Sequence, residues 1–293
     1  MGGDIGLSVT VPASVAFLER QNDVKLLMVG DEAKLQAALK SVNAPMNRIS
    51  VIHASEVVDM DEDPRNALRH KKDSSMRVAI NQVKEGLAEA AVSAGNTGAL
   101  MATAKFVLKT IEGIERPAIA KFLPTSDGGL TCVLDLGANI DSTPEHLLQF
   151  AIMGSQLVQA VNPQVKSPRV GLLNIGSEEI KGNSTVKEAY HQLQNSQLNF
   201  IGNVEGDDIF SGEVEVIVAD GFVGNVALKT IEGTVKMMGQ IIKNEFNSSA
   251  FTKAQGLIAK PVLAQVKKRI DPRRFNGAIF LGLRGVVVKS HGG

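Results

Sequence analysis

The stretch Ala-Val-Ser-Ala-Gly-Asn-Thr-Gly-Ala-Leu-Met-Ala-Thr-Ala-Lys-Phe-Val-Leu-Lys-Thr, residues 91 to 110, combines three local patterns. An apolar run ends at Ser93, small residues form a turn through Gly95 and Gly98, and apolar residues then recur at helical spacing up to Leu108. The stretch therefore predicts a strand, a glycine turn and a helix, which is the repeating unit of a parallel α/β sheet.

A turn of this kind leaves the first amides of the helix unpaired, and the helix dipole favours negative charge there. Gly95 and Gly98 would let a ligand approach the backbone, while Asn96 or Thr97 could cap the helix or donate to a bound oxygen. A single Gly-x-x-Gly is weak evidence, because most such turns only connect a strand to a helix. An anion site and a plain connection both remain open for this turn.

Polar glycine turns recur along the chain, at residues 2–4, 135–139, 174–182 and 220–225. Each places Asp, Asn, Glu or Lys beside glycine, and all but the first follow a predicted strand. Ligands bind along the carboxyl edge of open parallel sheets, so we expect these turns to share one rim and to form one composite site.

The composition describes a globular chain without a global charge. It has 293 residues, 44% of them hydrophobic, with 31 Lys plus Arg against 31 Asp plus Glu, one Tyr and no Trp. Such a chain can bury a large core, and neither its charge nor its few aromatic side chains favour a nucleic-acid surface. No apolar run approaches the roughly 18 residues of a membrane span, and the amino terminus has no signal-peptide pattern.

The single cysteine, Cys132, lies in an alternating pattern that indicates the interior of a strand. We expect a packed core thiol rather than a nucleophile, no intrachain disulfide and a cytoplasmic setting by default. The five histidines have no metal-ligand spacing, so we expect no metal site and no cofactor.

Strands and helices are predicted to alternate along the chain, which means an α/β fold with a largely parallel sheet. The predicted strands cover residues 25–29, 48–52, 118–122, 131–136, 170–174, 199–201, 214–219, 278–281 and 285–288. The predicted helices cover residues 8–20, 32–40, 74–85, 144–161 and 224–246, and a further helical stretch reaches residue 270.

The segment from about residue 234 to 270 is expected to form a protruding helical hairpin with its tip near residues 256–261. Its second half carries five basic residues and no acid between Phe246 and Ile270, interleaved with apolar side chains. Packing against a second subunit and contact with an anionic membrane surface are both compatible with this pattern.

A basic cluster follows the acidic loop 59–63 and consists of Arg65, Arg69, Lys71 and Lys72. The plain interpretation is a solvated loop and helix start, with acids near the amino end of the helix. The alternative is a docking face for an acidic partner.

In the residues of these glycine turns and in further segments, the sequence resembles the bacterial phosphate acyltransferase family (PlsX). The matching segments cover nearly the whole chain in order, at residues 1–4, 93–101, 113–118, 134–139, 150–155, 172–176, 220–225 and 288–292. They include Ser-Ala-Gly-Asn-Thr-Gly-Ala-Leu-Met from Ser93, Leu-Asp-Leu-Gly-Ala-Asn from Leu134 and Asp-Gly-Phe-Val-Gly-Asn from Asp220.

The resemblance implies a single three-layer α/β catalytic domain over residues 1–293, similar to phosphotransacetylases and isocitrate-type dehydrogenases. It implies a homodimer that associates peripherally with the membrane and passes acyl phosphate to glycerol-3-phosphate acylation. The family's first strand and terminal helix are expected to lie outside this chain.

The resemblance further implies that inorganic phosphate attacks the thioester of acyl carrier protein directly, with no enzyme nucleophile. On this basis Lys181 is the first choice for charge stabilisation, Asn225 the second, and Asn96 with the amides near Gly95, Thr97 and Gly98 would hold phosphate. The remaining candidates for substrate binding are Asp4, Asp135, Asn139, Glu178, Asp220 and His291. For each acid, helix capping is an equally good explanation.

The carrier protein is acidic and would meet the basic cluster of residues 65–72. Two other functions stay open, namely a phosphotransacetylase that uses acyl coenzyme A and a noncatalytic adaptor that recruits carrier proteins to the membrane. A decarboxylating dehydrogenase is less favoured, because no Asp-x-x-x-Asp cluster is evident.

Overall fold

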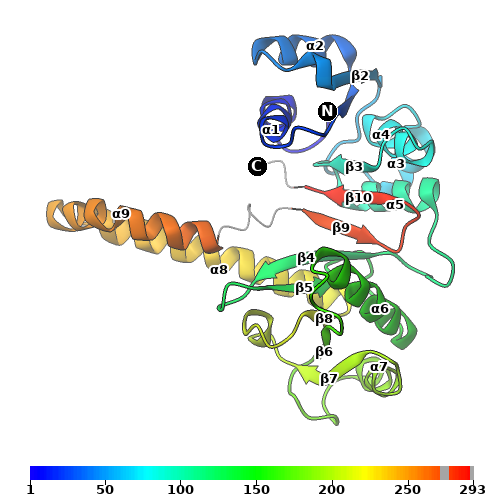
Figure 1. Cartoon of the computed structure of the whole chain (residues 1–293), viewed down its shortest axis with the longest axis vertical. Coiled ribbons are helices and arrows are strands. Elements are labelled where there is room, and N and C mark those ends of the chain that lie inside the picture. Colours follow the sequence, from blue (N-terminus) through cyan, green and yellow to red (C-terminus); the bar gives the residue numbers. More distant parts are fainter. Residues whose placement is uncertain (271–276, 291–293) are drawn as a thin grey trace. The chain divides into compact units, whose positions relative to one another are not determined.

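The computed structural model describes residues 1–270 and 277–290. The chain divides into two compact units, Met1–Pro117 together with Gly277–Gly293, and Ala118–Asn276. Each unit has its own strands and covering helices (Figure 1). No helix in the described ranges is both long enough and apolar enough to cross a membrane.

The first unit contains two groups of strands. β1 (Leu26–Gly30) pairs in parallel with β2 (Ile49–His53), while β10 (Val286–Lys289) lies between β3 (Ala90–Ser93), which is parallel to it, and β9 (Ala278–Leu281), which is antiparallel. The helices of this unit are α1 (Leu7–Arg20), α2 (Glu32–Ser41), α3 (Pro64–His70), α4 (Ser75–Lys84) and α5 (Thr97–Leu108), with a short 3₁₀ helix η1 (Met46–Arg48). The predicted strand, glycine turn and helix at residues 91–110 are confirmed as β3 and α5.

Helical periodicity builds the core of the first unit. Val11 and Leu18 of α1 meet Leu35 and Leu39 of α2, and the cluster closes on Ile49 of β2. Residues seven or four apart lie on one helical face, so each helix turns a single apolar stripe inward.

The second unit has one sheet with strand order β4-β5-β8-β6-β7. Its strands are β4 (Ala118–Pro124), β5 (Leu130–Leu134), β6 (Arg169–Leu173), β7 (Asn199–Val204) and β8 (Val216–Val218). The pairs β5–β8, β8–β6 and β6–β7 are parallel, and only β4–β5 is antiparallel among them. The expectation of an α/β fold with a mostly parallel sheet is therefore confirmed.

The helices of the second unit are α6 (Pro144–Val161), α7 (Ser184–Gln194), α8 (Gly221–Asn247) and α9 (Ala250–Ile270), with a short 3₁₀ helix η2 (Asp208–Phe210). α6 has the bounds that the sequence predicts, because Thr143 caps it and Pro144 begins it. α6 packs on β5, β8 and α7, and α8 packs on β5.

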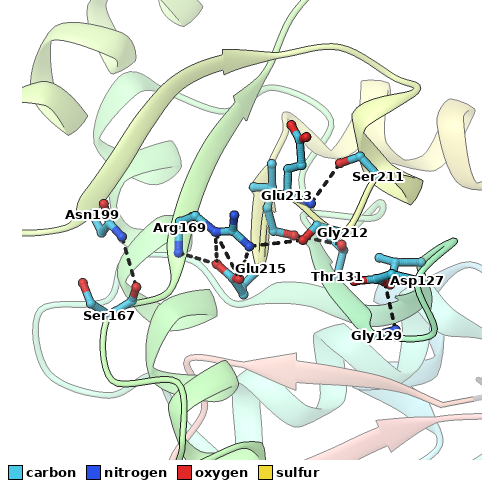
Figure 2. Close-up of polar contacts among 12 residues, drawn as sticks. Asp127, Gly129, Thr131, Ser167, Arg169, Asn199, Ser211, Gly212, Glu213 and Glu215 are labelled. Atoms are coloured by element: carbon cyan, nitrogen blue, oxygen red, sulfur yellow. Dashed lines mark hydrogen bonds and ion pairs between the residues drawn. The ribbon is translucent and has the colours of Figure 1, made fainter.

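Polar contacts tie together the amino ends of β5, β6 and β8 (Figure 2). Arg169, the first residue of β6, donates from Nε and Nη2 to the Glu215 carboxylate, and its Nη2 also reaches the Gly212 carbonyl. The Thr131 hydroxyl donates to the Val214 carbonyl at 2.8 Å. These contacts lie at the amino ends of the strands, whereas the candidate residues of this unit follow the carboxyl ends.

α8 and α9 form a helical hairpin, and they run side by side in Figure 1. The predicted tip near residues 256–261 is wrong, because α9 is continuous from Ala250 to Ile270 and the turn lies at Ser248 and Ser249. Gly256 lies against the Phe246 ring, so this glycine lets the two helices approach each other rather than ending a helix.

Candidate functional site

The carboxyl edge of the second unit's sheet brings three of the predicted turns onto neighbouring strands. Leu134 of β5 and Leu172 of β6 both pair with Val218 of β8, so the loops that follow these strands leave from adjacent positions. Adjacent strands lie about 4.8 Å apart, which keeps the starts of the three loops within about 10 Å. The candidates on this edge are Asp135, Asn139, Glu178, Lys181, Asp220 and Asn225.

Asp135 is fully buried and organises the loop after β5. One carboxylate oxygen accepts from the amides of Ile119 (2.8 Å) and Ala138 (3.1 Å), and the other accepts from the amide (2.7 Å) and side chain (2.9 Å) of Asn139. Burial raises the pKa of Asp135 above its ordinary value, and these hydrogen bonds oppose that rise. All four of these hydrogen bonds come from protein groups, which favours a structural role for this carboxylate.

The amino end of α8 packs closely against the same loop. Asp220 caps the helix by accepting from Phe222 N at 2.9 Å, and its other oxygen accepts from Ser142 N at 2.9 Å. A Cβ on Gly221 would overlap the Asn139 carbonyl oxygen, so only glycine fits there. Asp220 therefore fastens α8 to the loop after β5, as the capping explanation predicts.

Asn225 lies one helical turn further along α8, and its side chain is exposed at this edge. It faces Gly137, where a Cβ would come within 3.3 Å of the Asn225 Cβ and Cγ. Gly137 has φ +117°, a conformation that favours glycine, and its missing side chain leaves the Asn225 amide accessible.

The loop between β6 and α7 carries Lys181. Asn174 Nδ2 donates to the Lys181 carbonyl at 3.2 Å, and Asn203 Nδ2 donates to the Glu178 carbonyl at 3.0 Å. These bonds hold the backbone of the loop, while the side chains of Glu178 and Lys181 stay exposed and both pass beside Gly176. The loop thus has a backbone held by hydrogen bonds and an exposed lysine side chain.

In the first unit, the predicted turn at Gly95–Gly98 is built around Asn96, which is only 9% exposed. Asn96 Oδ1 accepts from Ala99 N at 2.9 Å and caps α5, while Nδ2 donates to the carbonyls of Met60 and Glu62 at 2.9 Å each. Both ends of this amide therefore bind the protein itself. The geometry favours a role in holding loop 59–62 against α5 over direct donation to a ligand.

Residues 2–4 lie beside the same turn. The position of a Cβ on Gly2 is 3.7 Å from the Gly95 Cα, and that of a Cβ on Gly3 is 3.3 Å from the Ala94 carbonyl oxygen. Asp4 is exposed. The structure thus places the predicted glycine turns at residues 2–4 and 95–98 beside each other within the first unit. Thr97 and Gly98, at the end of the second turn, are the first residues of α5.

Sequence reasoning did not single out Lys289, which ends β10 and is 7% exposed. Its Nζ lies 2.5 Å from the Ser290 carbonyl oxygen and 3.4 Å from that of Ala94. The sequence pattern that could have identified Lys289 as a candidate is a lysine directly after the apolar run Val286–Val288. The His291 candidate lies outside the described residues.

The four residues of the basic cluster differ in their contacts and in their exposure. Lys71 Nζ donates to the Glu62 carboxylate at 2.5 Å and to the Val57 carbonyl at 2.6 Å, so its charge is used within the fold. Arg65, Arg69 and Lys72 are exposed. Only these three remain suited to an acidic partner.

Cys132 is confirmed as a core thiol, because it is fully buried in β5. Burial raises the pKa of Cys132 to about 12. The thiolate that a nucleophile needs is therefore not formed near neutral pH.

Comparison with known proteins points to one family. Residues 1–293 match the model of a family described as fatty acid synthesis protein. A phosphate acyltransferase from Neisseria meningitidis serogroup C is 64% identical, and one from Chromobacterium violaceum is 61% identical; each match covers 100% of this chain and 84% of the relative.

Two solved structures share the fold at low sequence identity. A phosphotransacetylase from Streptococcus pyogenes has a TM-score of 0.59 at 18% identity and covers 78% of each chain. The EutD phosphotransacetylase from Staphylococcus aureus has a TM-score of 0.56 at 16% identity and covers 77% of this chain and 78% of its own. At these identities the likeness concerns the fold alone.

Proposed function

Since the chain belongs to the phosphate acyltransferase family, we propose that it transfers an acyl group from acyl carrier protein to inorganic phosphate. A phosphate oxygen attacks the thioester carbonyl carbon, the carbon–sulfur bond breaks, and the thiolate of the carrier leaves and takes up a proton. The products are the free carrier thiol and acyl phosphate, and the acyl phosphate serves phospholipid synthesis.

One observation supports this assignment above the others: Lys181 on the loop after β6 and Asn225 on the second turn of α8 are both exposed, while Asp135 and Asp220 bind protein amides. A lysine and an amide donor suit a reaction in which phosphate itself attacks. Lys181 would stabilise the phosphate and then the tetrahedral oxyanion, and Asn225 would donate to the same oxygen.

The test is an assay with palmitoyl carrier protein and phosphate that measures acyl phosphate by hydroxylamine trapping and the carrier thiol by a thiol reagent. Lys181→Ala should lower kcat about 100-fold or more, since removing one donor to a developing oxyanion has effects of that size. Lys187→Ala is the matched control, because Lys187 is exposed on α7 and its loss changes the net charge equally. Equal activity of the two variants would remove Lys181 from the mechanism.

The alternatives from the sequence are tested with the same assay. A phosphotransacetylase would use the coenzyme A thioester at least as well as the carrier thioester. An adaptor would bind the carrier without forming acyl phosphate from either donor.

We propose that the exposed arginines and lysine of the basic cluster bind the acidic carrier. Charge reversal by Arg65→Glu with Arg69→Glu should raise KM for palmitoyl carrier protein and leave KM for palmitoyl pantetheine unchanged, because the second donor lacks the protein. An equal change for both donors would mean that these arginines do not contact the carrier.

The helical hairpin is proposed to contact a second subunit, an anionic membrane surface, or both. Its exposed apolar side chains include Met237, Met238, Ile241, Ile242, Phe251, Leu257, Ile258, Val262 and Val266. α9 adds basic residues at positions 253, 260, 267, 268 and 269, which suits contact with anionic lipid. Acyl phosphate released at a membrane would lie close to a glycerol-3-phosphate acyltransferase.

Replacing Leu257 and Ile258 with Glu separates these two contacts. Loss of binding to anionic vesicles with an unchanged molecular mass in solution supports the membrane contact. A fall from dimer to monomer supports the subunit contact, and no change in either quantity contradicts both.

A further inference from the structure

Large apolar side chains are exposed on the three segments that follow the carboxyl ends of β5, β6 and β8, and two of these segments carry Lys181 and Asn225. Ile140 follows β5 and is 76% exposed, while Ile175 and Ile180 follow β6 and are 82% and 77% exposed. Phe222, Val223 and Val226 are exposed on the first two turns of α8. Exposed apolar residues are common elsewhere in the protein, but these six all follow the carboxyl ends of adjacent strands of one sheet.

These side chains are close in sequence to the polar candidates. Ile180 directly precedes Lys181, and Phe222 and Val226 lie three residues before and one residue after Asn225 on α8. Residues three apart are neighbours on a helix surface, so Phe222 and Asn225 share one side of α8.

The three segments also begin next to one another in the fold. Ser142 N donates to Asp220 Oδ2 at 2.9 Å, which fixes the loop that carries Ile140 against the start of α8. β8 pairs with both β5 and β6, so the loop that carries Ile175 and Ile180 leaves from the next strand. The apolar side chains thus lie on the same three adjacent segments as the polar candidates Asn139, Lys181 and Asn225.

We propose that Ile140, Ile175, Ile180, Phe222, Val223 and Val226 form the surface that receives the hydrocarbon chain of the acyl donor. This inference rests on the proposed function, because the thioester carbonyl must reach Lys181 and Asn225 while its hydrocarbon chain needs an apolar surface nearby. The six residues are named the acyl rim. Contact with the acyl rim lowers KM for long-chain donors and leaves kcat nearly unchanged, since the chain is bound equally in the ground state and the transition state.

The test compares palmitoyl and butyryl carrier protein as donors for wild type and for the double variant Ile175→Ser with Ile180→Ser. Both isoleucines are highly exposed, so the variant should keep the wild-type melting temperature. KM for the palmitoyl donor should rise about tenfold, whereas KM for the butyryl donor and kcat for both donors should stay within about twofold. Unchanged turnover of the butyryl donor also shows that Lys181 still functions on the altered loop.

The matched control is Leu87→Ser with Val161→Ser, which removes exposed aliphatic side chains outside the acyl rim. It should leave the ratio of the palmitoyl KM to the butyryl KM at its wild-type value. A wild-type ratio in the acyl rim variant overturns the acyl rim and leaves the proposed function standing.

Two further outcomes are decisive. If the acyl rim variant raises both KM values equally and converts a dimer to a monomer, the surface is a subunit contact and the proposal is wrong. If wild type forms no acyl phosphate from either donor, the proposed function and the acyl rim are both overturned.

Discussion

Gly224 lies so close to the backbone carbonyl of Asp135 that a Cβ on Gly224 would overlap the carbonyl oxygen. This contact seats the first turns of α8 on the loop after β5, and it is immediately followed by Asn225. The position of one catalytic candidate thus depends on a contact that tolerates no side chain.

Gly224→Ala should destabilise the protein by about 1–3 kcal/mol or more, because the added methyl must push α8 away from the loop. The same shift should lower kcat by moving Asn225. Urea unfolding and the acyl phosphate assay measure the two effects.

Gly233→Ala is the matched control on the same helix. A Cβ there meets no atom within 4 Å, so alanine should stabilise the protein by about 0.5–1 kcal/mol through its better helix propensity. Equal effects of the two substitutions would show that the Gly224 contact does not determine where α8 sits.

Asn96→Asp should destabilise the first unit by about 2–4 kcal/mol, because the new carboxylate would face the carbonyls of Met60 and Glu62. Asn183→Asp is the control, since Asn183 caps α7 from an exposed position and aspartate caps a helix equally well. Differential scanning calorimetry of both variants checks the prediction. A fall in kcat for Asn96→Ala at unchanged stability would instead assign Asn96 to phosphate binding.

We expect Asp135 to give the free energy of unfolding an unusual dependence on pH. Burial raises its pKa, so between the ordinary value of 3.8 and the raised value the folded protein holds a proton that the unfolded chain has released. The contribution of Asp135 to the free energy of unfolding therefore falls as the pH rises through that window. The advantage of wild type over Asp135→Asn should shrink with rising pH in urea unfolding between pH 3.5 and 7.

The variant Asp127→Asn should show a pH dependence of stability with the opposite sign. The Thr125 hydroxyl and the Gly129 amide hold the pKa of Asp127 below its ordinary value, so its contribution is present above 3.8 and is lost as the pH falls. The advantage of wild type over this variant should grow with rising pH. The same slope for both aspartates would contradict the raised pKa of Asp135.

The sequence alone predicts the elements whose limits depend on local chemistry. Thr143 and Pro144 mark the start of α6, and the glycine turn after Ser93 separates β3 from α5. The predicted position of the hairpin turn is wrong, because Gly256 and Pro261 suggest a break but both lie within α9. Tertiary packing against Phe246 decides the role of Gly256, and the sequence does not show that contact.

The sequence predicts which segments form the candidate site, but it does not predict what each polar side chain binds. The pattern of glycine with Asp, Asn or Lys locates the segments after the strands that carry Asp135, Lys181 and Asn225. It does not show that the Asp135 carboxylate binds Ile119, sixteen residues away, or that Asn96 binds the carbonyls near residue 60. Such long-range hydrogen bonds occupy polar side chains that the sequence alone would leave free to bind a ligand.

The pair Arg169–Glu215 gives the last prediction. Burial raises the pKa of Glu215, but the hydrogen bonds and charge of Arg169 outweigh burial and leave the pKa below its ordinary value of 4.5. A lowered pKa stabilises the folded protein above 4.5, and this contribution is lost as the pH falls through the folded value. Glu215→Gln should therefore cost about 1–3 kcal/mol at pH 7 and progressively less below pH 4.5.

Glu213→Gln is the control for this pair, because Glu213 is an exposed neighbour that points away from Arg169 in Figure 2. It should change stability by less than about 0.5 kcal/mol at every pH. Both variants leave the carboxyl edge intact, so kcat for acyl transfer should keep its wild-type value at temperatures where the protein is folded. A Glu215→Gln difference that persists below pH 4 would show that packing at the amino ends of β6 and β8, rather than the charge of Glu215, accounts for the effect.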